Sequence, residues 1–318
     1  MPFDFSSVKA PFRMQPGLRR LAPGSPQLTP NQPGSRALHE KLAVLKAHAP
    51  EALLAAPGFD AAPAVRALLS HAATEQPAAL RWDGDRRIDA CHIGWSLHDG
   101  EPVGPAGGAS GDVEPIGACL RKLPIEWRVP ALLSLAFVED FAVIDGRTGH
   151  IPWLAVCLPS HWSPAEKIGR HFAEVHAPVA DNQLLVTASA HLARLVTGDE
   201  RWERFVWTIT RHPNLDSHPQ RCAPGTWPAE ADADADVLAA LAFFRTERQT
   251  FIPLPSHGQA VFTIHVESSP LADAINDAAQ ARQLHDALAS MSANVLAYRG
   301  LADVQPRLLA WLAAHAGR

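Results

Sequence analysis

The sequence has few features that would place it in a specialised class of protein. It has four cysteines in 318 residues, Cys91, Cys119, Cys157 and Cys222, and no two of them form a CxxC pair. This spacing gives no pattern for a zinc ribbon or an iron–sulfur cluster, and scattered thiols suit a reducing compartment. The first 20 residues lack an apolar segment of the secretory type, and no apolar run approaches the roughly 20 residues of a membrane span. We therefore expect a cytoplasmic protein without a membrane partner.

Charge and short motifs also argue against several functions. The chain has 28 basic and 33 acidic residues, a net charge of -5, and no block of lysine and arginine, which argues against nucleic acid as a partner. A GxGxxG loop, a phosphate-cradling loop, a serine nucleophile elbow and a zincin motif are all missing. The hydrophobic fraction of 47% is that of a globular protein that can bury a core.

Hydrophobic periodicity predicts a mixed architecture. Residues 1–35 are expected to form an extended arm and residues 100–117 a long loop. Helices are predicted over residues 37–54, 61–71, 129–137, 163–176, 188–196, 237–244 and much of 271–315. Strands are predicted over residues 141–144, 153–158, 205–210, 250–254 and 260–267. The fold class is therefore α+β, with antiparallel strands in the middle and helices towards both ends. We divide the chain into an arm with a helical subdomain (1–80), a core (81–270) and C-terminal helices (271–318).

The segment 158–178 predicts a well-defined helix. Ser163 and Glu166 have the spacing of a capping box, and Pro164 occupies the first helical position, where its missing N–H is tolerated. Pro178 disfavours helical backbone at Ala177 and so predicts the end of the helix.

Ile168, Phe172, Val175 and His176 would share one face of this helix. His176 would then lie in the last turn and face an apolar interior. One interpretation is a core histidine with a satisfied N–H, which the pattern alone favours. The other is an axial haem ligand, since neutral imidazole coordinates haem iron. A single histidine does not decide between them.

Four ordered stretches of the chain carry a family resemblance. The run LPSHWSPAEKIG at 158–169, followed by VHAPV at 175–179, is the first. The others are PFRM at 11–14 with GLR at 17–19, VED at 138–140, and RTERQT at 245–250 with LP at 254–255 and VFTI at 261–264. Together they resemble the α-subunit family of haem-dependent oxidative N-demethylases over roughly residues 11–270.

The resemblance implies a PAS-like antiparallel sheet that binds haem b. It implies an oxidoreductase of the monooxygenase type, which activates O2 at the haem and removes a methyl group from a small secondary amine, such as dimethylamine, as formaldehyde. NADPH, FMN and a 2Fe-2S cluster are expected on a partner reductase subunit. A further folate-binding subunit would take up the one-carbon unit.

Within this resemblance we assign site residues. His176 is the expected iron ligand, and Phe172 and Ile168 would pack on the cofactor. Arg248 and Glu247 are the expected catalytic residues. Arg245 would bind the haem propionates, a role that Arg248 could also fill, or polarise oxygen. A solvated, salt-bridged strand edge is the alternative for this charged run.

Further histidines and one departure from the family pattern bear on the site. His265 is expected to line the cofactor pocket, although a solvent-facing position is as plausible and the family more often has a basic residue there. His161 and His171 are weaker ligand candidates than His176. His212 and His218 are six residues apart in a proline-broken loop, a weak pattern for a non-haem metal. Residues 204–207 resemble the family's Arg-Asn-Trp element with altered spacing. At this element the resemblance therefore does not imply the family's substrate.

Two functions compete with the enzyme. One is a haem-binding PAS-like sensor or binding subunit without turnover. The other is a scaffold that has lost haem. Fold-level analogy does not separate them, because function depends on the site.

Overall fold

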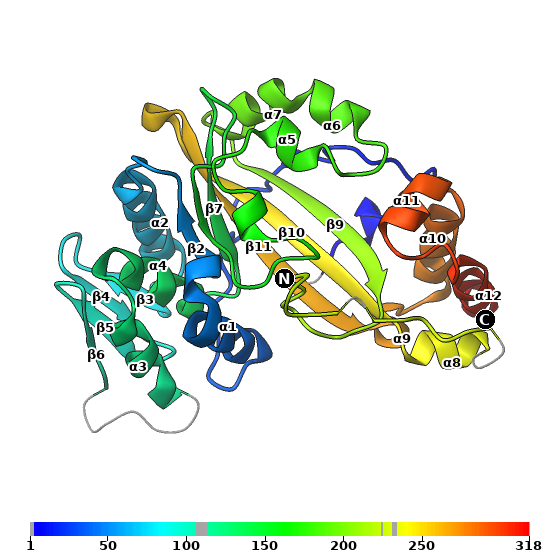
Figure 1. Ribbon diagram of the computed structural model, residues 1–318, viewed down its shortest axis with the longest axis horizontal. Coiled ribbons are helices and arrows are strands. Elements are labelled where there is room, and N and C mark those ends of the chain that lie inside the picture. The colour runs from blue at the N-terminus through cyan, green and yellow to red at the C-terminus, as the bar shows by residue number, and fades with distance from the viewer. Residues whose placement is uncertain (1–2, 106–112, 224, 231–233, 318) are drawn as a thin grey trace.

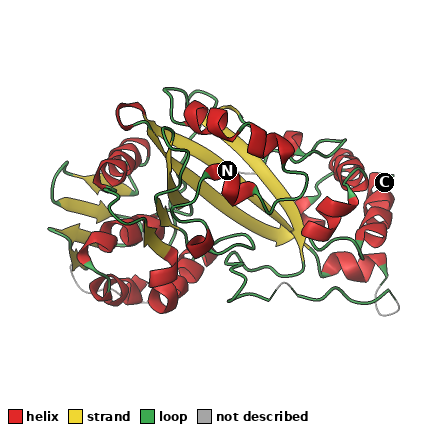
Figure 2. Cartoon of the chain, turned by 45° about the horizontal axis from the view of Figure 1, so that its top comes forward, coloured by secondary structure: helices red, strands yellow, loops and turns green. Residues whose placement is uncertain are grey.

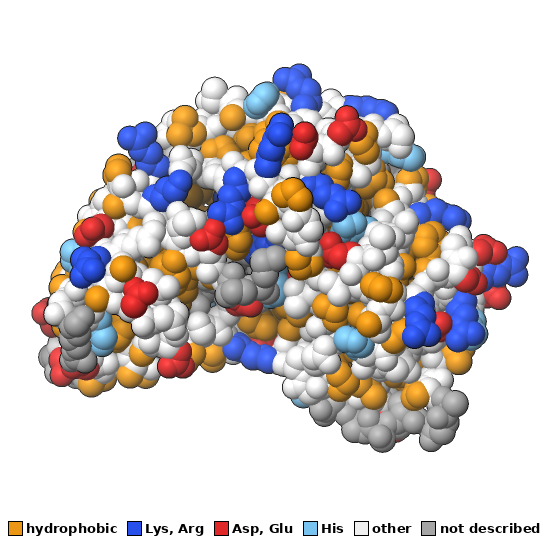
Figure 3. All heavy atoms as spheres, turned by 180° about the vertical axis from the view of Figure 1, so that it is seen from behind, with side chains coloured by type: hydrophobic (Ala, Val, Ile, Leu, Met, Phe, Trp, Pro, Cys, Tyr) orange, Lys and Arg blue, Asp and Glu red, His pale blue; other side chains and the backbone are white. Residues whose placement is uncertain are grey.

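The structure is a computed structural model that describes residues 3–105, 113–223, 225–230 and 234–317. It is an α+β fold with two antiparallel sheets, as the sequence predicts. The large sheet crosses the middle of the molecule, and helices gather at both of its ends (Figure 1, Figure 2). Basic and acidic side chains are interspersed over the back of the molecule (Figure 3).

The large sheet has seven strands in the order β1-β9-β10-β11-β7-β8-β2. Their bounds are β1 Arg19–Arg20, β9 Trp202–Thr210, β10 Phe243–Leu254, β11 Gln259–Pro270, β7 Asp140–Asp145, β8 Trp153–Ala155 and β2 Leu53–Ala55. The predicted hairpin between β10 and β11 is confirmed, and its pairing continues to Phe243 opposite Pro270, well beyond the predicted strands. The 3-10 turn η4 (Pro255–His257) and Gly258, at φ 63°, close it.

A second sheet of four strands was not predicted. It consists of β3 (Leu80–Trp82), β4 (Arg87–Ala90), β5 (Trp95–His98) and β6 (Glu101–Val103). Strands of three or four residues are too short to show a clear alternation of apolar and polar residues. The predicted loop at 100–117 is therefore replaced at its two ends by β6 and α3, while its residues 106–112 lie outside the described chain.

The helices form three groups around the large sheet (Figure 1). At one end, beside the small sheet, lie α1 (Arg36–Ala52), α2 (Ala62–Glu75), α3 (Glu114–Lys122) and α4 (Ile125–Ala136). Over one face lie α5 (Phe172–His176), α6 (Gln183–Thr187) and α7 (Ser189–Val196). At the other end lie α8 (Ala235–Ala240), α9 (Leu271–Ala274), α10 (Ala278–Ala289), α11 (Ala293–Tyr298) and α12 (Gln305–Ala316).

The single helix predicted over 163–176 is wrong. The segment forms a 3-10 turn, η3 (Pro164–Glu166), and then the separate helix α5. Gly169 has φ 70°, and its amide donates to the carbonyl of Ile151, so pairing with the β7–β8 connection overrides the local helical pattern. Ser163 makes no side-chain capping bond.

Other predicted boundaries also shift. The helix predicted over 237–244 ends at Ala240, because Phe243 and Phe244 pair with β9 and β11 as the start of β10. The predicted helical tail is divided into four helices.

The N-terminal arm is extended as predicted, with a short 3-10 turn η1 (Phe5–Ser7) and the edge strand β1. Its Phe12 ring lies against the Arg299 guanidinium, whose central carbon is 4.7 Å from the ring centroid, and Arg299 also lies over the Trp207 ring at 5.3 Å. The resembling stretch at 11–14 thus fastens the arm to β9 and to the end of α11.

Two large apolar clusters build the core. One joins α1–α4, the small sheet and strands β7, β8, β10 and β11, and the other joins β9 and the start of β10 to α8–α12. The predicted division of the chain into three parts, with boundaries at residues 80 and 270, stays a prediction. Within the described chain, no helix is both long and apolar enough to cross a membrane.

Candidate functional site

The two faces of the large sheet carry different side chains. Arg204 pairs with Gln249 and Val206 with Glu247, so these four side chains share one face of β9 and β10. Phe251 follows on this face and packs with Ala193 of α7, so it is the face that α5–α7 cover. We call it the α5–α7 face. Arg248 and His265 pair with each other on the opposite face.

His176, the last residue of α5, belongs to the α5–α7 layer. Its Nδ1 lies 2.8 Å from the carbonyl oxygen of Phe172, and since a carbonyl only accepts, Nδ1 donates. The Phe172 ring lies against the imidazole at a centroid distance of 4.1 Å. Nδ1 is therefore occupied and Nε2 is the nitrogen available as a ligand, the arrangement that orients ligating histidines.

The surroundings of His176 keep its ring neutral. Burial lowers the pKa of His176 to about 4, and the positive charges of Arg204 and Lys167 act in the same direction. The hydrogen bond to Phe172 opposes this shift but is outweighed. A neutral imidazole has a free lone pair at neutral pH, which metal coordination requires.

Asn182 and Lys167 stabilise the end of α5. The Asn182 side chain donates to the carbonyl oxygens of His176 and Ala177 at 3.0 and 2.7 Å, and Lys167 donates to that of Val175 at 2.9 Å. At its start, His171 accepts from the amide of Ala173 at 3.1 Å. His171 is thus the helix cap, which occupies its Nδ1.

Ile168 lies outside α5 and does not share a helical face with His176. Together with Val175 it packs against the apolar cluster of β7 and β8, which contains Ala142, Leu154 and Val156. Of the two predicted apolar cofactor contacts, only Phe172 touches the imidazole in this structure.

Two charged residues and an amide lie beneath this layer. The Nε of Arg204 is buried and has no hydrogen-bond partner among the described residues. Burial lowers the pKa of Arg204, and the carboxylate of Glu247 opposes this. Glu247 accepts from the amide of Gln249 at 2.6 Å. The α5–α7 face thus combines a neutral imidazole with a guanidinium and a carboxylate.

Arg245 shares this face, but its hydrogen bonds are used within the chain. It is 1% exposed and donates to Ser160 Oγ at 2.9 Å and to the carbonyl oxygens of Asn214 and Leu215 at 2.8 and 2.7 Å. Arg245 therefore ties two connecting segments to the end of the sheet.

Arg248 and His265 lie on the opposite face, beneath the N-terminal arm. Arg248 pairs with Glu203 at 3.0 Å and donates to the carbonyl of Pro26 at 2.7 Å. His265 lies between the carboxylates of Glu139 and Glu267, at 3.0 and 3.3 Å. The sheet separates both residues from His176.

The weaker histidine candidates have partners of their own. The rings of His161 and His212 meet edge to face at 5.5 Å, while His218 accepts from the amide of Gln220. His161 and His212 thus lie together, and His218 is engaged elsewhere. Among the described residues, no group of three or more His, Cys, Asp or Glu side chains is arranged to hold a metal ion.

One family comparison decides the affiliation of the chain. The family described as haem-dependent oxidative N-demethylase, alpha subunit-like, matches residues 129–309. The chain belongs to this family. No match was found among curated proteins.

The family match spans the whole candidate site. It includes α5–α7 and β9–β11, and therefore His176, Arg204 and Glu247. It excludes the N-terminal arm, whose resembling stretch begins at Pro11.

Haem is the group that this family implies, and the residues of the α5–α7 face fit it. Haem iron needs one imidazole from the protein, and His176 offers Nε2 with its other nitrogen already bonded. An apolar ring is in place at Phe172, and a cation with an unpartnered buried donor is in place at Arg204.

Sequence reasoning did not assign Arg204 to the site. Arg204 joins the site because it is paired with Gln249, and Glu247 lies two residues from Gln249 on the same face. That pairing becomes visible only when the register of β9 against β10 is known.

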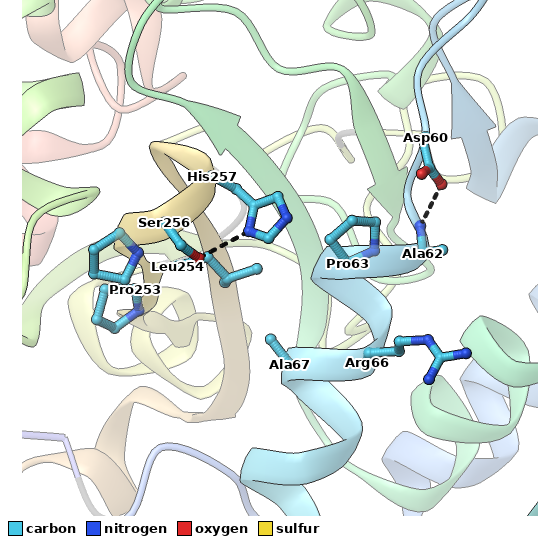
Figure 4. A pocket seen from close by; sticks show the side chains of 10 residues that line it. Asp60, Ala62, Pro63, Arg66, Ala67, Pro253, Leu254, Ser256 and His257 are labelled. Carbon is cyan, nitrogen blue, oxygen red and sulfur yellow. Dashed lines mark hydrogen bonds between the residues drawn. The ribbon is translucent and has the colours of Figure 1, made fainter. Parts of the chain in front are cut away.

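A surface hollow lies elsewhere. It measures about 590 Å³ and lies between the start of α2 and the η4 turn (Figure 4). Asp60 accepts from the amide of Ala62 at one side, and Ser256 bonds to His257 at the other. Its charged lining residues Asp60, Arg66 and His257 are all exposed, so it is an open surface groove.

Proposed function

We propose that this chain is the haem-binding oxygenase subunit of an oxidative N-demethylase that acts on a small secondary amine such as dimethylamine. The observation that carries the proposal is the His176 imidazole, whose Nδ1 bond to Phe172 leaves Nε2 as a ligand. Membership of the family supports the haem and the reaction type.

When bound, haem b supplies the redox chemistry that activates O2. The overall change balances with one oxygen atom in formaldehyde and the other in water, while two electrons and two protons are supplied and the amine loses one methyl group. We infer that the electrons come from NADPH through a partner reductase with FMN and a 2Fe-2S cluster, and that a folate-binding subunit takes up the formaldehyde.

The residues of this chain have separate roles in the proposal. His176 holds the iron, and Phe172 keeps the imidazole in its plane by ring contact. Glu247 provides a carboxylate that attracts an alkylammonium ion, and Gln249 orients it through the 2.6 Å hydrogen bond.

Arg248 and His265 act on the other face in this proposal. Their carboxylate partners fix β9–β11 against the N-terminal arm, and so hold the strands that carry Glu247 and Arg204. Arg245 fixes the segments at 159–160 and 214–215 around the same sheet.

The fold and location are proposals too. We infer a PAS-like arrangement, supported by an antiparallel sheet with α5–α7 packed on one face. We also infer a cytoplasmic location, supported by the four free cysteines.

Oxygen uptake tests the proposal. The haem-loaded protein with an artificial reductant is expected to consume O2 when dimethylamine is added and to release formaldehyde in equal amount. Glu247→Gln should raise KM for the amine, while Glu166→Gln, which changes an exposed carboxylate, should not. Haem binding without amine-dependent oxygen uptake would contradict turnover and favour a sensor.

A further inference from the structure

Three arginines project from the central strands, and the chain supplies partners to only two of them. Arg245 donates to a hydroxyl and to main-chain carbonyls, and Arg248 is paired with the Glu203 carboxylate. Arg204 donates no side-chain hydrogen bond to a described residue, and its Nε is shielded from solvent. It is the guanidinium whose bonding the described part of the chain leaves incomplete.

The nearest anion does not complete it. Glu247 lies close enough to oppose the effect of burial on Arg204, but the two form no ion pair within the described structure. Glu247 already accepts a hydrogen bond from Gln249. Because a partly buried cation without a paired anion is costly, this arrangement favours a ligand that brings a negative charge.

The position of Arg204 limits what that ligand is. Arg204 lies on the α5–α7 face of β9, and His176 is the last residue of α5, so both residues belong to the same side of the large sheet. A guanidinium binds a carboxylate through two parallel N–H bonds. Haem b carries two carboxylates at its edge, and its iron would be at His176.

We propose that Arg204 binds a propionate carboxylate of the haem that His176 ligates. The inference rests on the proposed function, because it requires haem at this face. It assigns to Arg204 the role that the sequence suggested for Arg245 or Arg248, which are already bound to groups of the chain.

Haem dimethyl ester distinguishes propionate binding by Arg204 from a general effect of Arg204 on the haem site, because the propionates of the ester are uncharged. We expect the wild-type protein to bind haem at least about tenfold more tightly than the ester, as a charge-assisted pair predicts. Arg204→Gln should lose about tenfold in haem affinity, leave the ester affinity unchanged and so remove the preference. Arg204→Lys should keep part of it. The readout is the Soret titration, without turnover.

Arg201→Gln is the matched control, since Arg201 precedes the same strand and is exposed. It should leave both affinities unchanged. In the haem-free protein, Arg204→Gln should not lower Tm, because it removes a partly buried charge that has no paired anion.

Equal weakening of haem and ester binding by Arg204→Gln would overturn the inference, and so would a preference for haem that survives the substitution. The latter result would indicate that another residue recognises the propionates. Absence of a Soret band in the wild-type protein would instead contradict the proposed function itself, so the two failures are distinguishable.

Discussion

The Nδ1 atom of His176 donates a hydrogen bond to the carbonyl oxygen of Phe172, one helical turn earlier, at 2.8 Å. This bond fixes the tautomer, because the proton is on Nδ1 and the lone pair is on Nε2. The Phe172 ring at 4.1 Å limits rotation of the imidazole. A five-residue helix therefore presents one nitrogen in a defined direction.

The N-terminal cap of α5 depends on Gly149. Its φ is 71°, and a Cβ there would lie 2.4 Å from Nε2 of the capping residue His171. We expect Gly149→Ala to lower the free energy of unfolding by about 2–3 kcal/mol and to weaken haem binding. Gly58→Ala has φ 76° and open space, so it should cost only about 1 kcal/mol. Urea denaturation and Soret titration measure both effects, and equal losses would show that the His171 cap is unimportant.

Arg248 is expected to act on stability. It is 6% exposed and paired with Glu203, which Arg19 also contacts at 3.0 Å. Arg248→Met should lower the free energy of unfolding by about 3 kcal/mol, because Glu203 loses its buried partner. Arg20→Gln, which breaks an exposed pair with Glu200, should cost less than about 0.5 kcal/mol.

Arg248→Met also tests on which face of the sheet the haem binds. Arg248→Met protein that is still folded should give the wild-type Soret maximum. A shifted maximum would place Arg248 at the cofactor and contradict the assignment of the α5–α7 face.

His265 should make stability depend on pH above neutrality. Burial alone would lower its pKa, but hydrogen bonds with Glu139 and Glu267 raise it to about 9. The folded protein thus holds a proton that the unfolded chain releases near pH 6.5. This contribution is complete below pH 6.5 and is lost as pH rises through about 9.

His265→Gln removes this contribution. We expect the variant to be less stable than wild type by about 2 kcal/mol at pH 6, and the difference to shrink towards pH 9.5. Denaturation of both proteins across this range measures it. A difference that is independent of pH would show that the His265 proton does not stabilise the fold.

The long elements of the fold could be predicted from sequence. The β10–β11 hairpin follows from its alternation and from the turn at Pro255–Gly258, which are local signals. The small sheet could not be predicted, because its strands are short and depend on packing such as that of Trp95 against Gly117. The break at Gly169 depends on a hydrogen bond to Ile151, which no local pattern shows.

The candidate site was predictable only in part. His176 followed from the resemblance, and its place at the end of a helix was right although the helix is shorter. Arg245, Glu247 and Arg248 are adjacent in sequence, but alternation along β10 turns Arg248 to the other face. Arg204 belongs to the site because β9 pairs it with Gln249, and this register is set by the tertiary structure.

The Soret titration of His176→Ala tests the central claim most directly. Wild-type protein and His191→Ala, which changes an exposed histidine on α7, should bind haem with the same spectrum and affinity. His176→Ala should lose the histidine-ligated spectrum and bind haem at least about tenfold more weakly. An unchanged spectrum and affinity in His176→Ala would contradict the account and move the ligand to another histidine.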